Sequence, residues 1–585
     1  MSVAGSEAQF HPAHEGRAAT NPPPMPGLHL AVGLAQGAAL WLIHRMQSRM
    51  SADWSAACLY LALALPLAWY LSHGGSQRQR DRTVLLAAIA ALFTWLGWHA
   101  GRESLGHGVV GAGQFFAAGV LGFVLVPLAC GFDAARRRFD YPRLFELAWR
   151  NATLVLASFA LTGVLWVLLW AGAWLMRSIG LHGLGELLVE PAFAYVTTGG
   201  AFGLATALTL RRADTLLALR RFWLSLTTWC LPLALGFALA WVCALPFTGV
   251  TPLFDTKSAA FYLFWFGALT VSFANAAFQD GREALPYHPW LARALSWAWL
   301  AMLPLAGLAD WALAQRVMQH GWTPDRIWGA LVGLIVTIHS LGYAAALWRR
   351  GAWMNTIPAT NIAAALLMVG ALTALLSPLG DVRRIAVASQ VGRLLGGAIG
   401  PEAFDWQFLR AQGAAGQAAL AQLASTTAPD ATARRIARRA AQALRDEANP
   451  NTQDPQAALA TAREHMSVLP RGAEPPASLL EWLSREHADW IERSCLSTPA
   501  RCRLWLTDLD RDGRTEAVLL WDTGGGVQAV LYALEAAGWR QQGSLRGGPV
   551  QLEDWEQAID SGHVEPASTK WPDLMIDGRR TSLAP

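Results

Sequence analysis

Long apolar segments fill the first two thirds of the chain. A helix rises about 1.5 Å per residue and the hydrocarbon layer of a bilayer is about 30 Å thick, so about 20 mostly apolar residues predict a membrane-spanning helix. About eleven segments between Gly27 and Pro378 meet this condition. They run from Gly27 to Leu42, Trp54 to Leu71, Thr83 to His99, Val109 to Cys130, Asn151 to Met176, Pro191 to Leu210, Trp223 to Phe247, Ser258 to Phe278, Trp290 to Ala314, Ile327 to Trp348 and Ile357 to Ser377.

The pattern changes after Pro378 to amphipathic helices rich in Ala and Arg, and from Arg503 onward to short strands. We therefore expect a mainly α protein. A polytopic transmembrane helix bundle occupies 27–378, a soluble helical region 379–500 and a small α+β domain 501–585. Residues 1–26 are expected to form a disordered tail.

Composition supports the membrane assignment. Apolar residues make up 53% of the chain and charged residues only 15%, against about 25% in soluble domains. Trp is abundant, with 29 residues, and ten of them, including Trp41, Trp174 and Trp348, lie toward the ends of the predicted spans, where indole rings favour the headgroup region. The lipid bilayer is thus an expected partner. The Arg434 to Arg439 cluster is interpreted as a solvated helix face, and no nucleic-acid partner is expected.

The distribution of arginine predicts the orientation, because short loops rich in Lys and Arg stay in the cytoplasm. Arginines concentrate in alternate loops, including Arg78 to Arg82, Arg136 to Arg138 and Arg211 to Arg221. The N-terminus is therefore expected in the cytoplasm. With an odd number of spans, the C-terminal domain is expected in the periplasm of a bacterium, with the bundle in the inner membrane.

Polar residues inside the spans are the candidates for an intramembrane site, since burying them is costly and they face a bundle interior or a cavity. The candidates are Asp310, His339, Tyr343, Asn275 and Asn361. His339 and Tyr343 are four residues apart and share a helix face. The alternative is that these residues only form interhelical hydrogen bonds.

A tight connection is predicted between the ninth and tenth spans. Arg316 to Arg326 reads Arg-Val-Met-Gln-His-Gly-Trp-Thr-Pro-Asp-Arg. Gly321 suits a tight turn, Thr323 can cap the next helix and Pro324 suits its first position.

This motif resembles the Arg-x-x-x-x-Gly-x-Thr-x-x-Arg hairpin of a bacterial multi-spanning membrane family known as domain of unknown function 4153. The region of Pro252 to Asp255 and Asn275 is also similar to that family. The resemblance covers roughly residues 30–378. It implies membrane location and topology, and it brings no activity or catalytic residue.

An aspartate-rich loop is the sharpest motif of the C-terminal domain. Carboxylates alternate at Asp508, Asp510 and Asp512, followed by Gly513 and Glu516, and Ca²⁺ prefers such oxygen ligands. Strand-like flanks disfavour a helix-loop-helix site, and the loop is similar to those of FG-GAP repeats. Bound calcium and a metal-free turn with Asx hydrogen bonds both remain open.

Two cysteines lie in the soluble half. Cys495 and Cys502 enclose a turn-prone stretch and could form a disulfide, which an oxidising periplasm would preserve. Two free thiols in a cytoplasmic domain are the alternative.

Biochemical activity is not indicated by any motif, since no phosphate-binding, dinucleotide-binding, nucleophile-elbow or metal-binding His signature is found. We expect a non-enzymatic envelope scaffold or sensor that presents its C-terminal domain to a periplasmic protein partner. A secondary transporter or channel is one alternative, and an enzyme acting at the outer membrane interface is another.

Overall fold

The computed structural model describes residues 25–72, 79–104, 111–133, 136–251, 253, 258–282, 286–349, 353–426, 430–448, 467–486, 502–509, 513–522, 527–535, 538–545, 551–562, 564, 574–576 and 579–581. The chain divides into two compact units, Met1–Ala443 and Leu444–Pro585. This division differs from the boundaries expected near 378 and 500. The helices that follow the last span pack on the bundle, and the C-terminal sheet begins earlier in the chain than its strand pattern indicated.

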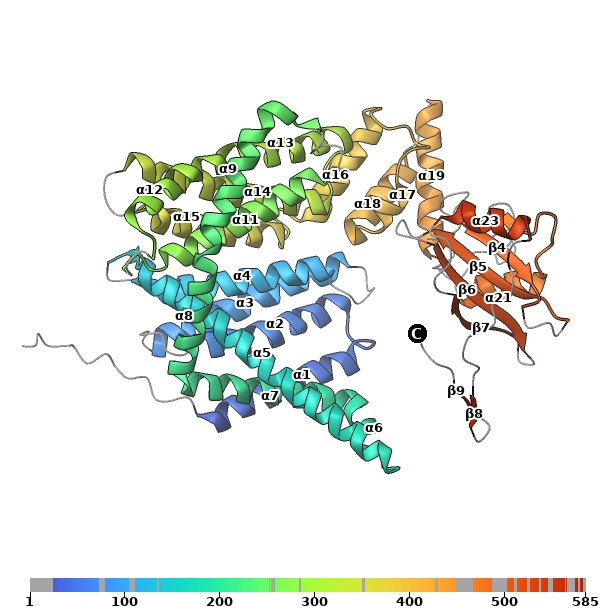
Figure 1. Ribbon diagram of the computed structural model, residues 1–585, viewed down its shortest axis with the longest axis horizontal. Helices are drawn as coiled ribbons and strands as arrows, with labels where there is room; N and C mark the ends of the chain where they lie inside the picture. Colours follow the sequence, from blue (N-terminus) through green and yellow to red (C-terminus); the bar gives the residue numbers. More distant parts are fainter. Residues whose placement is uncertain are drawn as a thin grey trace, which may run out of the picture. The chain divides into compact units, whose positions relative to one another are not determined.

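The first unit consists mostly of helices (Figure 1). They are α1 (Pro26–Met46), α2 (Ala52–Leu71), α3 (Gln79–Glu103), α4 (Ala112–Gly131), α5 (Tyr141–Ser178), α6 (Gly183–Val189), α7 (Pro191–Arg211), α8 (Ala213–Thr228), α9 (Cys230–Thr248), α11 (Ala259–Phe278), α12 (Pro289–Ala298), α13 (Met302–His320), α14 (Pro324–Ala344), α15 (Ile357–Leu375), α16 (Val382–Leu395), α17 (Trp406–Arg410), α18 (Gly413–Ala424) and α19 (Ala431–Ala448), with the 3-10 turns η1 (Trp299–Ala301) and η2 (Ala345–Trp348) and the short strands β1 (Phe132–Asp133) and β2 (Arg138–Phe139).

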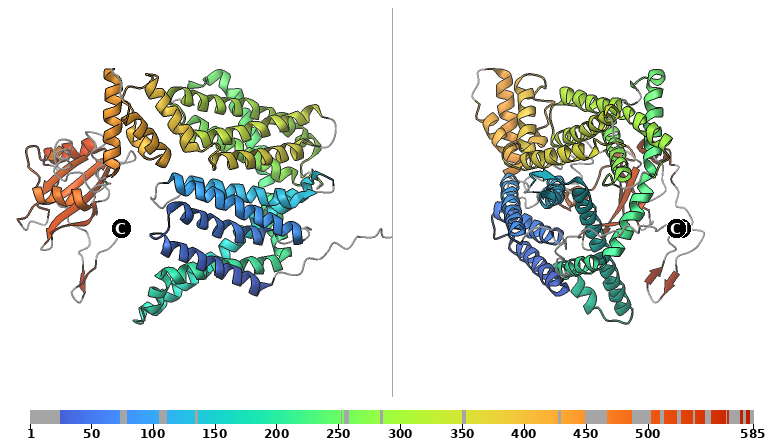
Figure 2. Two further views of the ribbon diagram at one scale, coloured as in Figure 1. Left: turned by 180° about the vertical axis from the view of Figure 1, so that it is seen from behind. Right: turned by 90° about the vertical axis from the view of Figure 1, so that its left-hand side faces the viewer.

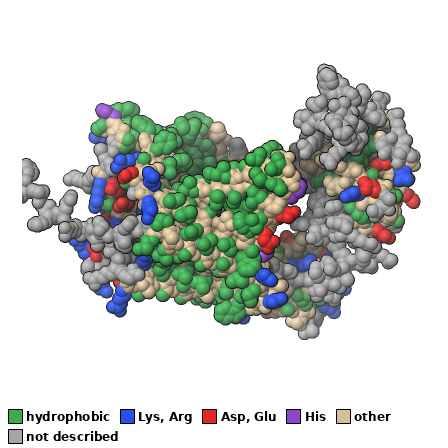
Figure 3. Space-filling model, turned by 90° about the horizontal axis from the view of Figure 1, so that it is seen from below, with side chains coloured by type: hydrophobic (Ala, Val, Ile, Leu, Met, Phe, Trp, Pro, Cys, Tyr) green, Lys and Arg blue, Asp and Glu red, His purple; other side chains and the backbone are tan. Residues whose placement is uncertain are grey.

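Eleven helical segments of the described chain are long and apolar enough to cross a membrane, which confirms the expected polytopic bundle. Two of them combine consecutive helices, α8 with α9 and α12 with α13. Large apolar side chains point outward from these spans; Phe159, Val167 and Trp174 are 62%, 68% and 74% exposed. Figure 3 shows hydrophobic side chains covering the face between the two ends of the helices. Such a surface fits a multi-pass protein whose solvent is lipid.

The spans form two groups that lie side by side (Figures 1 and 2). One apolar cluster joins α2, α3, α4 and α5 to the end of α15, with Leu121 and Leu154 at its centre. The other joins α8 to α15, with Trp299 and Met302 fully buried. α5 contributes to both clusters and α15 to both, so these two helices connect the groups.

Small residues bring α1 and α7 into direct backbone contact. Gly33 and Gly37 of α1 face Gly199 and Gly203 of α7, and none of these positions has room for a Cβ atom. α7 continues unbroken through Gly199 and Gly200, so these glycines allow close packing without interrupting the helix.

The chain enters and leaves the bundle at opposite ends. The Tyr70 hydroxyl donates to the carbonyl of His29, which places the start of α1 at the end of α2. Arg82 donates to the carbonyl of Trp69, so α3 starts at that same end. Asp381 follows α15 and contacts His99 near the end of α3. Because α3 crosses the bundle from its start at Arg82, Asp381 lies at the opposite end of the bundle from the start of α1. This arrangement agrees with an odd number of spans.

The turn between α13 and α14 has a structural role. Gly321 adopts a φ of 76° and Pro324 is the first residue of α14, as expected. The expected capping by Thr323 is wrong, because its side chain makes no cap hydrogen bond. The guanidinium of Arg326 instead donates to the carbonyl of Gly321 at 2.6 Å, which stabilises the turn from within its own motif.

The helix α16 lies against this turn and against the end of α3. Gln390 donates to the carbonyls of His320 and Trp322, and Arg393 donates to the carbonyl of Gln319. Next along the chain, Gly413 at the start of α18 lies so close to the last turn of α3 that a Cβ atom would overlap its backbone. These helices therefore belong to the same unit as the spans.

The second unit is a five-stranded sheet with a helix on each face. Its elements are β3 (Ser467–Leu469), α21 (Ala477–Glu486), β4 (Cys502–Thr507), β5 (Glu516–Asp522), β6 (Val527–Glu535), β7 (Gly538–Leu545) and α23 (Leu552–Asp560), followed by a hairpin of β8 (Leu574–Ile576) and β9 (Arg579–Thr581). The strand order is β3-β4-β5-β6-β7; only β3 and β4 pair in parallel. Along β5, Ala517 and Leu519 pack toward α21, whereas Val518 and Leu520 pack toward α23. The small α+β domain is thus confirmed.

We predict that Gly199→Ala destabilises the bundle. The new methyl group would meet the backbone of Gly33 and Gly37, and overpacking of this kind costs about 1–3 kcal/mol. Unfolding in a detergent titration would measure the loss of free energy. Gly163→Ala in α5 is the matched control, since its Cβ meets open space. Equal stability of the two variants would contradict close packing of α1 on α7.

Candidate functional site

Four of the five predicted intramembrane polar residues come together between α11, α14 and α15. Asn275 donates to the Tyr343 hydroxyl at 2.9 Å, and that hydroxyl donates to Asn361 at 2.5 Å. Asn361 in turn donates to Asn275 and to the hydroxyl of Tyr141 at the start of α5. His339 stands edge-on to the Tyr343 ring, 5.5 Å between centroids, and within hydrogen-bonding reach of Asn361.

The polar groups of this network are hydrogen-bonded mainly to one another. Tyr343 is fully buried, and the Asn275 amide also donates to its own helix at the carbonyl of Val271. A cavity of about 280 Å³ reaches Asn275 and Asn361, but its other lining side chains are almost all apolar. Asp310 does not join the network and instead accepts a hydrogen bond from Thr337 at 2.7 Å. The group has the properties of an interhelical clamp.

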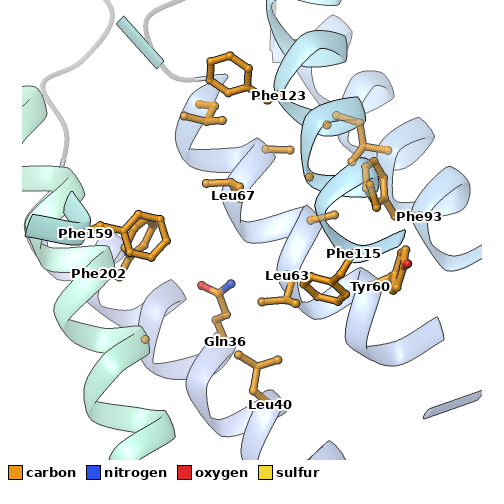
Figure 4. Close-up of a pocket in the computed structure, with 18 of the residues that line it drawn as sticks. Gln36, Leu40, Tyr60, Leu63, Leu67, Phe93, Phe115, Phe123, Phe159 and Phe202 are labelled. Atoms are coloured by element: carbon orange, nitrogen blue, oxygen red, sulfur yellow. The ribbon is translucent and has the colours of Figure 1, made fainter. Parts of the chain in front are cut away.

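A long apolar groove lies in the other group of helices. Its volume is about 600 Å³, and side chains from α1, α2, α3, α4, α5 and α7 line it. Figure 4 shows Phe159 and Phe202 on one side, with Tyr60, Phe93 and Phe115 on the other. The α2 lining runs from Tyr60 to Leu71, roughly 16 Å at the helical rise per residue.

A small number of polar side chains line the groove. Two of them are satisfied within the protein: Gln36 donates to the carbonyl of Ala62, and Thr162 to that of Ser158. The Tyr60 side chain is different. It is 3% exposed, and its hydroxyl has no hydrogen-bond partner within the described part of the chain.

Arg383 of α16 lies close enough to the Tyr60 hydroxyl to interact with it electrostatically. Its Nη2 donates to the side chain of Gln114 at the start of α4, at 2.5 Å. Its Nη1 is buried and has no partner among the residues that the structure describes. The groove therefore has an unpaired hydroxyl in its wall at Tyr60, with an unpaired guanidinium nitrogen of Arg383 nearby, and both groups can donate to an anion.

A second polar cluster occupies the same end of the bundle, where α3 meets α16. His99 Nε2 and Asp381 Oδ2 lie 2.7 Å apart, with 4% and 1% of their side chains exposed. Glu103, one turn after His99, accepts a hydrogen bond from Arg384 at 2.6 Å. His99, Glu103 and Arg384 line a cavity of about 740 Å³.

Asp381 also begins α16, because its carboxylate accepts from the backbone N–H of Arg383 as an N-cap. Burial alone would raise the pKa of Asp381, but the bonds from His99 and from the Arg383 backbone outweigh it and hold the pKa below the ordinary value. The carboxylate is therefore ionised at neutral pH.

The aspartate-rich loop joins β4 to β5, between strands as predicted. Gly513 has a φ of 84°, and its backbone N–H donates to Asp508 at 3.0 Å. Glu516 is buried and accepts from the backbone of Leu509 at 2.7 Å. Asp510 and Asp512 lie outside the described residues, so calcium binding stays a prediction.

Cys502 is buried in β4 and is disulfide-bonded. Cys495 lies outside the described residues, and its pairing with Cys502 stays a prediction. Cys58, Cys130, Cys230 and Cys243 are not in disulfide bonds within the described structure.

No protein-family model, curated protein or solved structure matches this chain. The resemblances to domain of unknown function 4153 and to FG-GAP loops therefore stay predictions. Function has to be argued from the geometry alone.

The residues at the α3–α16 end are the ones that sequence reasoning missed. A local signal existed for two of them, since His99 and Glu103 are four apart and share a helix face. The sequence pattern places Asp381 and Arg383 in a soluble region, whereas their contacts with α3 and α4 join residues more than 250 positions apart in the chain.

We predict that Asn361→Ala lowers the free energy of unfolding by about 1–3 kcal/mol, because it leaves buried groups on Tyr343, Tyr141 and Asn275 unpaired. Ser272→Ala is the control, since that exposed hydroxyl bonds only to its own helix. Denaturant titration in detergent measures both. A loss no larger than that of the control would show that the network does not clamp the helices.

Proposed function

We propose that this protein is a lipid-binding envelope scaffold or sensor, which holds an anionic membrane amphiphile in the α1–α7 groove. The acyl chain lies along α2, and the headgroup reaches Tyr60 and Arg383. One observation carries the proposal. The apolar groove is lined by Tyr60, whose buried hydroxyl has no partner in the described structure, and Arg383, with an unpaired Nη1, lies near that hydroxyl.

Physical chemistry favours an anionic amphiphile over a neutral one. A groove of this size and lining accommodates an apolar ligand, and in a bilayer the acyl chains are the most abundant apolar molecules. Leaving a buried donor unpaired costs about 1–3 kcal/mol, and more for a charged group. A phosphate oxygen would satisfy both donors with charge-assisted hydrogen bonds, which a zwitterionic headgroup with a competing cation does less well.

The alternative of transport receives less support from the polar side chains. Asn275, Tyr343 and Asn361 bond to one another instead of lining a polar chamber.

An enzyme at the membrane interface has one observation in its favour. The His99 imidazole is held by Asp381 at the edge of a cavity, as in general bases oriented by a carboxylate.

We further propose that the bundle lies in a bacterial inner membrane, with the N-terminus cytoplasmic and the C-terminal domain in the periplasm, where it meets a protein partner. The arginine-rich loops support this orientation. The opposite placement of the start of α1 and the end of α15 is consistent with it.

For lipid binding, we predict that Arg383→Gln reduces the binding of phosphatidylglycerol about 10-fold, or ~1.4 kcal/mol, and leaves phosphatidylethanolamine nearly unchanged. Native mass spectrometry of delipidated protein with an equimolar mixture of the two lipids measures the bound fractions. Arg393→Gln is the matched control, because it removes the same charge from α16 but its guanidinium bonds to the carbonyls of Met318 and Gln319 in the last turn of α13.

A second variant separates the groove from the headgroup site. Gly119 lines the groove and its Cβ would meet open space, so Gly119→Phe should reduce the binding of both lipids by filling it. Gly236→Phe on α9 has equal free space outside the groove and should not. If Arg383→Gln and Arg393→Gln behave alike, the proposed headgroup site is wrong.

For orientation, we predict that alkaline phosphatase fused after the last residue is active in a bacterial host, whereas green fluorescent protein fused there stays dark. The same reporters fused after Arg349, between the last two spans, should give the reverse pattern. Fluorescence at the C-terminal fusion would contradict the proposed sidedness.

A further inference from the structure

Three side chains of metal-ligating type converge where α3 meets α16. His99, Glu103 and Asp381 are all buried, and each offers one ligand atom within 4.8 Å of the others. His99 and Glu103 are fixed on one face of α3 by their four-residue spacing. Asp381 is fixed by its role as N-cap of α16. The three residues therefore come from two rigid helices.

An independent observation on Glu103 points to a ligand. Its side chain is only 5% exposed, and Oε1 is satisfied by Arg384. Oε2 is buried and has no hydrogen-bond partner among the described residues. A buried carboxylate oxygen without a partner is strongly unfavourable unless a cation or a donor meets it. Neither Asp381 nor Glu103 can supply that donor to the other while both are ionised.

We propose that His99, Glu103 and Asp381 bind a divalent transition metal ion, with zinc as the representative. Two carboxylates supply the charge that balances the ion, and the neutral imidazole supplies a nitrogen, a donor set typical of zinc and manganese. Mg²⁺ and Ca²⁺ prefer oxygen ligands throughout. In this site the metal takes the place of the proton shared by His99 and Asp381 at 2.7 Å.

The surroundings provide access and leave a position open. His99 and Glu103 line the cavity of about 740 Å³, so an ion can enter from it and a water molecule or ligand can complete the coordination shell. Arg384, whose side chain is 53% exposed, bonds to Oε1 of Glu103 and orients that carboxylate. The lipid site at Tyr60 and Arg383 uses other side chains, so the metal site does not depend on it.

The experiment uses the full-length protein, purified in detergent without a polyhistidine tag and stripped with a chelator. Co²⁺ is the probe, because coordination by protein ligands gives visible absorption bands that free aqueous Co²⁺ lacks at comparable intensity. We expect native protein to develop these bands and to lose them when Zn²⁺ is added. Glu103→Gln should weaken binding at least about 10-fold.

Glu103→Gln is the decisive variant, because its amide oxygen can still accept from Arg384 while the negative charge is lost. Glu402→Gln is the matched control, an exposed glutamate paired with Arg439 at 2.6 Å. Asp508→Asn tests for binding at the aspartate-rich loop and should leave the bands unchanged. If Glu103→Gln misfolds, His99→Gln, which keeps a donor to Asp381, takes its place.

Two outcomes would overturn the site. One is native protein that shows no cobalt bands at any concentration. The other is a Glu103→Gln or His99→Gln variant that elutes as native protein on size exclusion and binds Co²⁺ as tightly as the Glu402→Gln control. Either result would leave the cluster as a hydrogen-bonded joint between α3 and α16.

Discussion

The stability of the bundle depends on close packing and hydrogen bonds between helices, because lipid provides little hydrophobic driving force for helix association. Apolar side chains gain little by leaving acyl chains for other apolar side chains, so helix association relies on close packing and interhelical hydrogen bonds. Both devices occur here, in different halves of the bundle. Gly33 and Gly199 bring α1 and α7 into backbone contact, and Asn275, Tyr343 and Asn361 join α11, α14 and α15. Four of the five polar residues that the sequence singled out thus form interhelical contacts.

The same constraint explains why the groove and the buried ionisable groups stand out. Where the helices α1, α2, α4 and α7 do not close on one another, about 600 Å³ of space remains, and we propose that a lipid occupies it. α16 then brings polar groups to the end of these helices. Asp381 meets His99, Arg383 approaches Tyr60, and Arg384 meets Glu103, all from the first turn of that one helix. The start of α16 thus places charged side chains at the end of the bundle, near Tyr60 of the groove.

Much of the fold could be predicted from the sequence, because hydropathy and the spacing of apolar residues are local properties of the chain. The eleven spans, the strands from Cys502 to Leu545 and the turn at Gly321 were predictable in this way. Ser467–Leu469 was not, because a three-residue strand that pairs in parallel with β4 carries little pattern of its own. Thr323 illustrates another limit, since its N-cap position was correct but its side chain does not cap.

The site was less predictable than the fold. Polar residues inside spans are conspicuous, and four of them do converge, but sequence could not tell a clamp from a pathway. The α3–α16 cluster depends on α16 folding back onto the bundle through Gln390, Arg393 and Gly413. Those contacts connect distant segments, and the amphipathic pattern of α16 was equally compatible with a separate soluble region.

The most direct test of a lipid-handling bundle is a cryo-electron microscopy map of the full-length protein in nanodiscs made with native lipids. We expect continuous elongated density along α2 between Leu71 and Tyr60, ending in a headgroup within hydrogen-bonding distance of Arg383. A groove closed by the side chains of α4 and α7, with Arg383 bonded to protein groups alone, would contradict the account.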